Sequence, residues 1–318
     1  MIEFHGVSKL YGPVKAIDGI DLTIERGEFV LLIGASGSGK STLLKMVNRM
    51  EAHDAGQILL NGRDIDSFKL RELRLRMGYA IQSVGLFPHW SVARNIATVP
   101  RMLGWPAEKI SQRVIELLHL FDLDPEIYAK RLPHELSGGQ QQRVGVARAL
   151  AADPDVLLMD EPFGALDPVI RASLQLELKR VHQASGKTIV MVTHDIDEAL
   201  LLATRIVLLD HGRVVQVGTP LQLLAEPAND FVVDFAGRSD IGIKLLSLQL
   251  AQDFSRAEPQ QAGPGLPATI ATTATLREAL SFMALHRIAQ VNLADASGAH
   301  AGVLHAADIF EKPEARRG

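Results

Sequence analysis

The most constraining feature of this sequence is a loop with the pattern G-x-x-x-x-G-K-S. It follows Phe29–Ile33, an apolar run typical of a strand buried on both faces, and it precedes a helical pattern over Ser41–Met50. Glycines let such a loop wrap closely, so that its N–H groups point inward at phosphate oxygens. A glycine-rich turn before an ordinary helix is the alternative, but the strand–loop–helix context favours a nucleotide site. The residues expected around the phosphates are Gly34, Ala35, Ser36, Gly37, Ser38, Gly39, Lys40, Ser41 and Thr42.

Two side chains of this loop and two acids farther along the chain predict the chemistry. Lys40 can reach the β- and γ-phosphates, and the Ser41 hydroxyl can ligate Mg²⁺. The apolar run Val156–Met159 ends in Asp160 and Glu161, and parallel strands place such ends at the ligand crevice. Asp160 fits a carboxylate that organises Mg²⁺, and Glu161 fits a base or polarising group for the attacking water. Two acids that merely cap the strand are the alternative interpretation.

A second helix start able to hold an anion is indicated by Leu136–Gln140, the sequence LSGGQ. Ser-Gly-Gly stands ahead of a helical pattern, and a helix N-terminus of this kind can bind phosphate. One ATP does not need two such cradles from a single subunit. A plain capping box between Ser137 and Gln140 is the alternative, and both interpretations can hold at once.

Strand and helix patterns alternate through most of the chain. Antiparallel strands are expected at the start, over Ile2–Phe4 and Ala16–Ile24. Later patterns alternate in the order Val156–Met159, Val169–Ala184, Thr188–Thr193, Asp195–Ala203 and Ile206–Leu209. This alternation implies a mostly parallel sheet with helices on its faces. Trp90–Leu123 carries two helical patterns, which predict a helical subdomain inserted into an α/β core. The apolar stripe of the second pattern is Ile110, Val114, Leu117 and Leu118.

Composition narrows the classes of function. The chain has 318 residues, no cysteine and a formal net charge of -4. Disulfides, thiolate zinc sites and a cysteine nucleophile are therefore ruled out, and a nucleic-acid partner gains no support. The start lacks the pattern of a signal peptide, and apolar stretches such as Glu198–Leu209 are shorter than the roughly 20 residues that a membrane helix needs. We expect a cytoplasmic protein that serves any membrane process through other chains.

Because LSGGQ lies between the P-loop and a strand ending in Asp-Glu, residues 1–240 resemble the ABC ATPases. The resemblance implies that Tyr11 stacks on adenine, that Gln82 contacts Mg²⁺ and water and senses membrane subunits, and that His194 contacts the γ-phosphate. It implies a D-loop at a dimer seam for Gly164–Asp167. Taken singly, Tyr11 could instead be a turn aromatic, Gln82 a solvated loop residue and His194 a satisfied strand-end histidine. The signature residues implied to bind nucleotide are Ser137, Gly138, Gly139 and Gln140.

Shorter pieces of the sequence look like the ATPases of glycine betaine/choline-type osmoprotectant importers. These pieces are Asn48–Met50, Gln82–Trp90, Glu161–Pro168 and Gly237–Asp240 with Leu245-Leu246. The likeness implies an ATP-hydrolysing subunit that energises uptake of a small quaternary amine, although such a subunit never touches the cargo itself. The alternatives are the ATPase of an exporter with separate membrane subunits and a non-transport ABC ATPase. The second kind usually carries a long coiled coil, two cassettes or basic insertions, and none is visible here.

The resemblance also implies an architecture and partners. The fold is expected to be an α/β P-loop core with an antiparallel β subdomain and a helical subdomain at about 83–152, together spanning 1–240. One P-loop and one signature per chain imply a head-to-tail homodimer with ATP between Lys40 of one subunit and Ser137 of the other. Transmembrane permease subunits are implied as partners, with an extracytoplasmic substrate-binding protein acting through them. The chain would then lie on the inner face of the membrane.

The tail is expected to be separate from the ATPase. Residues 241–268 are interpreted as a connecting segment and linker, since Ala251–Pro267 is rich in Gln, Ala, Gly and Pro. Residues 269–318 resemble a single short CBS motif, with a helix, a strand, a turn and another strand. Such motifs usually come in tandem, and a single copy cannot bury its sheet face alone. We expect it to pair with the second subunit's copy or to pack on its own cassette, in a regulatory or dimerising role; a degenerate remnant is the alternative.

Overall fold

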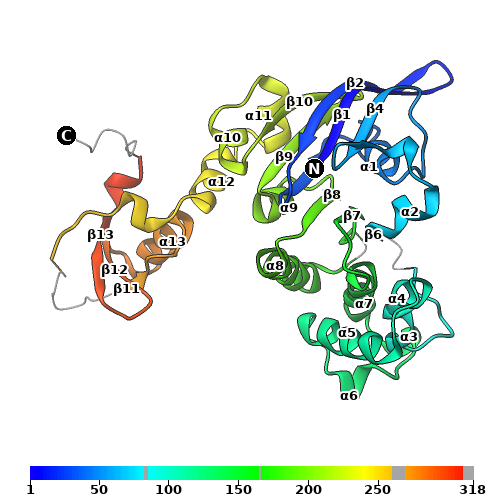
Figure 1. The fold of residues 1–318 in the computed structure, drawn as a ribbon. Helices are drawn as coiled ribbons and strands as arrows, with labels where there is room; N and C mark the ends of the chain where they lie inside the picture. Colours follow the sequence, from blue (N-terminus) through cyan, green and yellow to red (C-terminus); the bar gives the residue numbers. More distant parts are fainter. Residues whose placement is uncertain (82–84, 165, 260–268, 311–318) are drawn as a thin grey trace. The chain divides into compact units, whose positions relative to one another are not determined.

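The computed structural model describes residues 1–81, 85–164, 166–259 and 269–310 (Figure 1). The chain divides into two compact units, Met1–Pro220 and Leu221–Gly318. Within the described ranges, no helix combines the length and the apolar character that crossing a membrane requires.

A six-stranded sheet, in the order β10-β9-β3-β8-β7-β6, forms the centre of the first unit (Figure 1). Its strands in chain order are β3 (Phe29–Ile33), β6 (Met77–Ala80), β7 (Val156–Asp160), β8 (Thr188–Val192), β9 (Arg205–Asp210) and β10 (Arg213–Gly218). The first five run parallel, and β10 pairs antiparallel with β9. The prediction of a mostly parallel sheet is confirmed. Strands β3 and β8 are buried at every position, which explains their unbroken apolar sequences.

A second sheet is antiparallel, in the order β2-β1-β4-β5. Its strands are β1 (Ile2–Tyr11), β2 (Val14–Ile24), β4 (Ala55–Leu60) and β5 (Arg63–Asp64). Strand β1 continues well beyond Phe4, where the sequence pattern ends. The reason is that the β1–β2 register shifts between Phe4 and Val7, and such a bulge breaks the alternation of side chains between the two faces.

The two sheets and helix α1 (Lys40–Val47) share one apolar core. Ile2 and Phe4 from β1 pack in the same buried cluster as Leu43 and Leu44 from α1 and Val190 from β8. Burial of this much apolar surface fixes the helix that follows the P-loop against both sheets.

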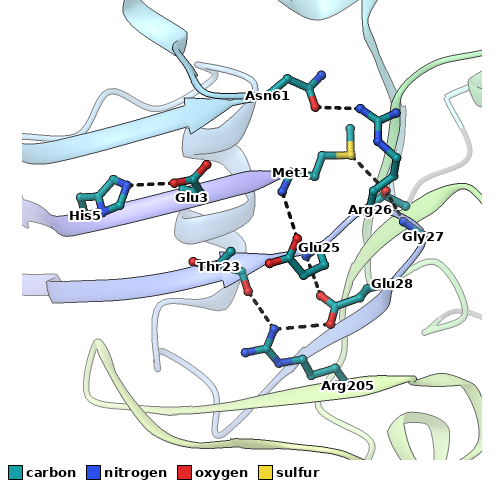
Figure 2. Close-up of polar contacts among 11 residues, drawn as sticks. Met1, Glu3, His5, Thr23, Glu25, Arg26, Gly27, Glu28, Asn61 and Arg205 are labelled. Carbon is teal, nitrogen blue, oxygen red and sulfur yellow. Dashed lines mark hydrogen bonds and ion pairs between the residues drawn. The ribbon is translucent and has the colours of Figure 1, made fainter.

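Polar contacts near the start of the chain also fasten the antiparallel sheet to the parallel one (Figure 2). Within the antiparallel sheet, the Met1 amino group lies 3.9 Å from the carboxylate of Glu25, which follows β2. Arg205, the first residue of β9, donates to the Thr23 carbonyl oxygen at 2.9 Å and lies 3.4 Å from the Glu28 carboxylate. Because Arg205 belongs to the parallel sheet, these bonds help to fix the position of the β1–β2 hairpin.

Five described helices follow β6 and precede β7, in the region predicted to be a helical subdomain. They are α3 (Val92–Ile96), α4 (Thr98–Met102), α5 (Ala107–Leu120), α6 (Pro125–Tyr128) and α7 (Gly138–Leu150). All four residues of the apolar stripe predicted for α5 are buried. The pattern over Trp90–Leu123 predicts two helices, whereas the structure has three, because the first pattern is divided between α3 and α4. The other helices of the unit are α2 (Leu70–Leu75), α8 (Pro168–Ser185) and α9 (Ile196–Leu202).

The second unit contains a three-stranded sheet and several helices. Its elements are α10 (Pro220–Ala225, starting at the boundary), α11 (Asp230–Ala236), α12 (Ile241–Leu248), β11 (Thr269–Ala271), α13 (Leu276–His286), β12 (Gln290–Ala294) and β13 (His300–His305). The described part of the stretch expected to be a linker is packed against the rest of this unit, since Ala251 and Phe254 are buried against α13 and β12. The helix–strand–strand order agrees with the pattern predicted for the tail, and its likeness to a CBS motif stays a prediction.

Candidate functional site

Three neighbouring parallel strands deliver the predicted catalytic residues to one edge of the central sheet. The P-loop follows β3, Asp160 ends β7 and is followed by Glu161, and His194 comes two residues after β8. Because β8 lies between β3 and β7, these ends meet at the carboxyl edge of the sheet. A cleft of about 600 Å³ opens there, and its lining residues are Tyr11, Ala16, Ser36, Gly37, Gly39, Lys40, Ser41, Thr42, Glu161 and His194.

The glycines of the P-loop serve different purposes. A β-carbon on Gly34 would lie 2.1 Å from the Leu209 carbonyl oxygen, and one on Gly39 would lie 2.4 Å from the Ala16 carbonyl oxygen. Both residues also have left-handed φ angles, so only glycine fits. Gly37 has a φ of 80°, but a β-carbon placed on it would meet no described atom within 4 Å. Gly34 and Gly39 therefore shape the loop, while Gly37 leaves its surface open to the cleft.

Lys40 lies folded against its own loop. Its Nζ donates to the carbonyl oxygens of Gly34 and Ala35, both at 2.8 Å. Burial lowers the pKa of Lys40, although the Glu161 and Asp160 carboxylates act in the opposite direction. The ammonium group is thus held at the cleft by carbonyl oxygens, the kind of ligand that a phosphate oxygen can replace.

The hydroxyl and the carboxylate predicted to ligate Mg²⁺ lie together. Ser41 Oγ donates to Asp160 Oδ1 at 2.8 Å, which joins the start of α1 to the end of β7. Sequence reasoning missed Lys45, whose Nζ lies 3.8 Å from Asp160 Oδ2. A signal was available, because Lys45 stands four residues after Ser41 and such residues share a helix face.

Glu161 and His194 form a pair at the edge of the cleft. Glu161 Oε2 lies 3.4 Å from His194 Nδ1. Glu161 has a φ of 45°, in the left-handed region that costs a non-glycine residue on the order of 1 kcal/mol. Its N–H donates to the Val192 carbonyl oxygen at 3.1 Å, which helps to hold this backbone conformation. The structure therefore brings together an acid and a histidine that lie far apart in the sequence.

Tyr11 stands at the end of β1 with its side chain half exposed, and it lines the same cleft. Burial raises the pKa of Tyr11, and the Glu51 carboxylate adds to the rise. Lys9 Nζ lies 5.3 Å from the centroid of its ring. The ring is thus available at the cleft, as an aromatic that stacks on a base must be.

The signature lies elsewhere in the unit. Ser137 caps α7, where Ser137 Oγ accepts from Gln140 N at 3.3 Å and Gln140 Oε1 accepts from Ser137 N at 3.0 Å. The capping box is therefore present. Ser137 and Gly138 are exposed, and Gly139 is buried. Among the described residues that line the cleft of the P-loop, none belongs to this helix start.

Two predicted positions fall on residues that the structure does not describe. Gln82 lies outside the described residues, and so does Ala165 of the D-loop. The end of the D-loop is described: Asp167 caps α8, and its Oδ1 accepts from Ile170 N at 3.0 Å. His194 and Asp167 thus stand in known positions, while the role of Gln82 stays a prediction.

Comparison with known proteins agrees with this geometry. Residues 17–164 match the profile of the family described as "ABC transporter". The glycine betaine uptake system ATP-binding protein YehX of Escherichia coli is 55% identical over 310 residues, which are 98% of this chain and 99% of that protein. The glycine betaine/carnitine/choline transport ATP-binding protein OpuCA of Bacillus subtilis is 48% identical over 93% of this chain and 76% of its own length.

A solved structure is similar as well. It is the dimeric, post-hydrolysis state of the ATP-binding cassette MJ0796 bound to ADP and Pi, with a TM-score of 0.61 and 32% identity over 69% of this chain and 99% of that one. The fold, the cleft at the P-loop and these matches together identify the chain as a member of the ABC transporter family, namely one of its ATP-binding, ATP-hydrolysing subunits.

Proposed function

We propose that this chain works as a head-to-tail dimer that hydrolyses Mg-ATP and thereby energises uptake of a small osmoprotectant through separate permease subunits. The observation that carries this proposal is the division of the site. Lys40, Ser41, Glu161 and His194 line one cleft, whereas Ser137 and Gly138 at the start of α7 are exposed and line none of it. A second copy can supply its own Ser137 to that cleft, and twofold symmetry makes the two sites equivalent.

The residues present fit a magnesium ion. A hydroxyl and a carboxylate oxygen, Ser41 Oγ and Asp160 Oδ1, lie 2.8 Å apart at the cleft, and Mg²⁺ prefers oxygen ligands of this kind. Gln82 is proposed as a further ligand from the resemblance. When bound, Mg²⁺ would neutralise charge on the phosphates of ATP.

The other residues of the cleft support hydrolysis directly. The N–H groups of the P-loop and the Lys40 ammonium stabilise the phosphate oxygens. Glu161 holds and polarises the attacking water, and its carboxylate is positioned to accept a proton from it. His194 Nδ1 lies 3.4 Å from Glu161 Oε2, close enough to orient the carboxylate. Its contact with the γ-phosphate is proposed from the resemblance. Tyr11, which lines the same cleft, stacks on the adenine.

A groove elsewhere in the first unit supports a membrane partner. It has a volume of about 740 Å³ and is lined by α2, β6, α4 and the end of α7. Three of its apolar side chains are markedly exposed: Leu70, Phe87 and Met102. Exposed apolar surface that lines a groove is characteristic of a protein interface. We assign it to the permease subunits, which would hold the chain on the inner face of the membrane.

Disrupting this groove should uncouple the chain from its permease. Met102 is 57% exposed, so Met102→Glu should leave the ATPase activity of the isolated subunit unchanged. A charge in an apolar interface is costly, so copurification with the permease and the ATPase activity of the assembled transporter should be lost. Ile127→Glu is a matched control, because Ile127 is 50% exposed in the same helical region but lines no part of the groove. Normal assembly of the Met102→Glu subunit would assign the permease to another surface.

The cargo is proposed from the relatives. YehX is named for glycine betaine, and OpuCA is named for glycine betaine, carnitine and choline. We infer a cargo of the same quaternary ammonium class, delivered by an extracytoplasmic substrate-binding protein. The deciding experiment is uptake of labelled glycine betaine and choline by vesicles that contain this chain, its permease and that protein. Transport should require ATP on the cytoplasmic side and stop with Lys40→Ala; export of the label instead would contradict the import proposal.

We also propose the division of labour along the chain. Residues 1–240 form the ATPase, with the helical subdomain at about 83–152, and 241–268 connect it to the tail. The tail, 269–318, is proposed to regulate the transporter modestly or to stabilise its dimer.

A further inference from the structure

The first turns of α7 and α8 touch each other, and this contact ties the signature to the end of the D-loop within one subunit. A β-carbon placed on Gly139 would lie 2.4 Å from Ile170 Cγ2, far inside the range of real carbon contacts. Ile170 stands in the first turn of α8, which Asp167 caps. Only a glycine lets the two helices approach this closely. The start of α7 therefore rests directly on the start of α8.

One turn farther along α7, a partly buried ion pair joins the same two helices. Arg143 Nε donates to Glu177 Oε2 at 2.9 Å, and the Glu177 side chain is only 6% exposed. The other carboxylate oxygen, Oε1, is buried and has no hydrogen-bond partner among the described residues. Burial raises the pKa of Glu177, the Arg143 guanidinium opposes this rise, and the Asp122 carboxyl in the turn after α5 adds to it. Among the described residues, Arg143 is thus the cation that pairs with the Glu177 carboxylate.

The ion pair lies close enough to the signature to govern its position. Ser137 caps α7 six residues before Arg143, and a rise of 1.5 Å per residue makes the distance along the axis about 9 Å. The helix between them is continuous, so a shift of Arg143 moves Ser137 with it. Glu177, in turn, belongs to α8, whose first turn is continuous with the D-loop.

We propose that Arg143 and Glu177 are positioning residues for ATP hydrolysis, holding α7 on α8 so that Ser137 meets the nucleotide bound by the second copy. This inference rests on the head-to-tail dimer proposed above. Neither side chain lines the cleft of its own subunit, so both act through the signature helix. Their effect should therefore fall on the partner's nucleotide and spare the subunit's own P-loop.

The first test separates turnover from nucleotide binding. A misplacement of about 1 Å at a catalytic contact can cost on the order of a hundredfold in rate, so kcat of Arg143→Ala should fall about ten- to a hundredfold. Binding of Mg-ATP by the monomer should stay near that of the parent chain. Glu177→Gln keeps an oxygen that accepts from Arg143 and should retain most of the turnover, whereas Glu177→Ala should not. Glu177→Gln and Arg143→Lys also keep the test decisive if an alanine variant fails to fold.

The matched control is Arg113→Ala. Arg113 lies in the same subdomain and donates to the Leu150 and Ala151 carbonyl oxygens, at 3.1 and 3.4 Å, so it supports the opposite end of α7. Its loss should lower thermal stability without a comparable loss of kcat. If Arg113→Ala and Arg143→Ala lower kcat equally, the effect is a general weakening of the helical region and the inference is wrong.

The second test locates the defect in mixed dimers. A dimer of one Arg143→Ala subunit and one Lys40→Ala subunit has one composite site with both lesions and one with neither, so activity should rise above that of either parent. No rise would overturn the inference, provided that the reference mixture of Lys40→Ala and Gly138→Asp subunits does recover. If heterodimers form but the reference mixture stays inactive, the head-to-tail arrangement itself fails, and this inference fails with it.

Discussion

Two helices of the first unit begin at glycine-rich turns that can hold a phosphate, and they differ in what surrounds them. The start of α1 is enclosed by the end of β7, by His194 and by the tip of β1. The start of α7 has exposed Ser137 and Gly138, and the Ser137 hydroxyl accepts a hydrogen bond within its own capping box. The start of α1 thus lies in a cleft lined by the predicted catalytic residues. The start of α7 lines none of that cleft, and in the proposed dimer it would contact the nucleotide bound by the second copy. The difference teaches that a motif can be as specific in sequence as a P-loop and yet lie outside the cleft that its own subunit forms.

The largest effect should come from the enclosed helix start. Glu161→Gln keeps the shape of the side chain but removes the carboxylate that polarises water, so turnover should fall by about 10²- to 10⁴-fold. Mg-ATP should still bind, and ATP should make the purified subunit more dimeric, because the seam closes and is not reopened by hydrolysis. Hydrolysis rates and size-exclusion profiles with and without ATP would measure both effects. Turnover like that of the parent chain would contradict the role of Glu161 in polarising the attacking water.

The next prediction tests whether the two helix starts belong to different subunits of one site. Lys40→Ala and Gly138→Asp homodimers should each be inactive, because each carries its lesion in both composite sites. Mixing them should restore partial activity, since a heterodimer holds one intact site. Crosslinking or differential tagging must establish that heterodimers form. Inactive heterodimers would argue that α1 and α7 serve the same nucleotide within one subunit.

A smaller effect should separate the two glycines at the start of α7. The nearest described atom to a β-carbon on Gly138 is 4.0 Å away, so Gly138→Ala should keep or slightly raise thermal stability while it lowers turnover. Gly139→Ala must push Ile170 aside, and such overpacking typically costs about 1–3 kcal/mol of unfolding free energy. Ile170→Ala in the Gly139→Ala background should recover part of that loss. Equal melting temperatures for both alanine variants would contradict the close contact with α8.

The smallest effect is expected in the second unit. Truncation after Leu250 should leave the ATPase activity of the reconstituted transporter largely intact, with little change in its response to salt. Met283→Asp, which puts a charge into the buried cluster of this unit, should behave in the same way without shortening the chain. Loss of salt activation in either variant would make the tail a working sensor. In that case ATP hydrolysis in the first unit would depend on the tail.

Much of the site could be predicted from the sequence because its signals are local. An apolar run buried on both faces, a glycine loop and a helix lie next to one another in the chain. The sequence of Phe29–Ile33 and the P-loop therefore predicts a strand, a phosphate-binding loop and a helix in that order. The run ending in Asp160 and Glu161 is local in the same sense. Within the parallel sheet the carboxyl ends of such strands meet, and the cleft follows from that rule.

Only the tertiary structure decided the contacts between helices and the packing of the tail. Nothing near Gly139 in the sequence indicates Ile170, and nothing near Arg143 indicates Glu177, because those partners depend on how α7 crosses α8. The local sequence predicts that Ala251 and Phe254 belong to a linker, whereas the structure buries both in the cluster around α13. The sequence by itself determined which side chains could do the chemistry, since spacing along one strand, loop or helix controls that. Their final positions came from packing between segments far apart in the chain, where burial and close contact leave no local pattern to read.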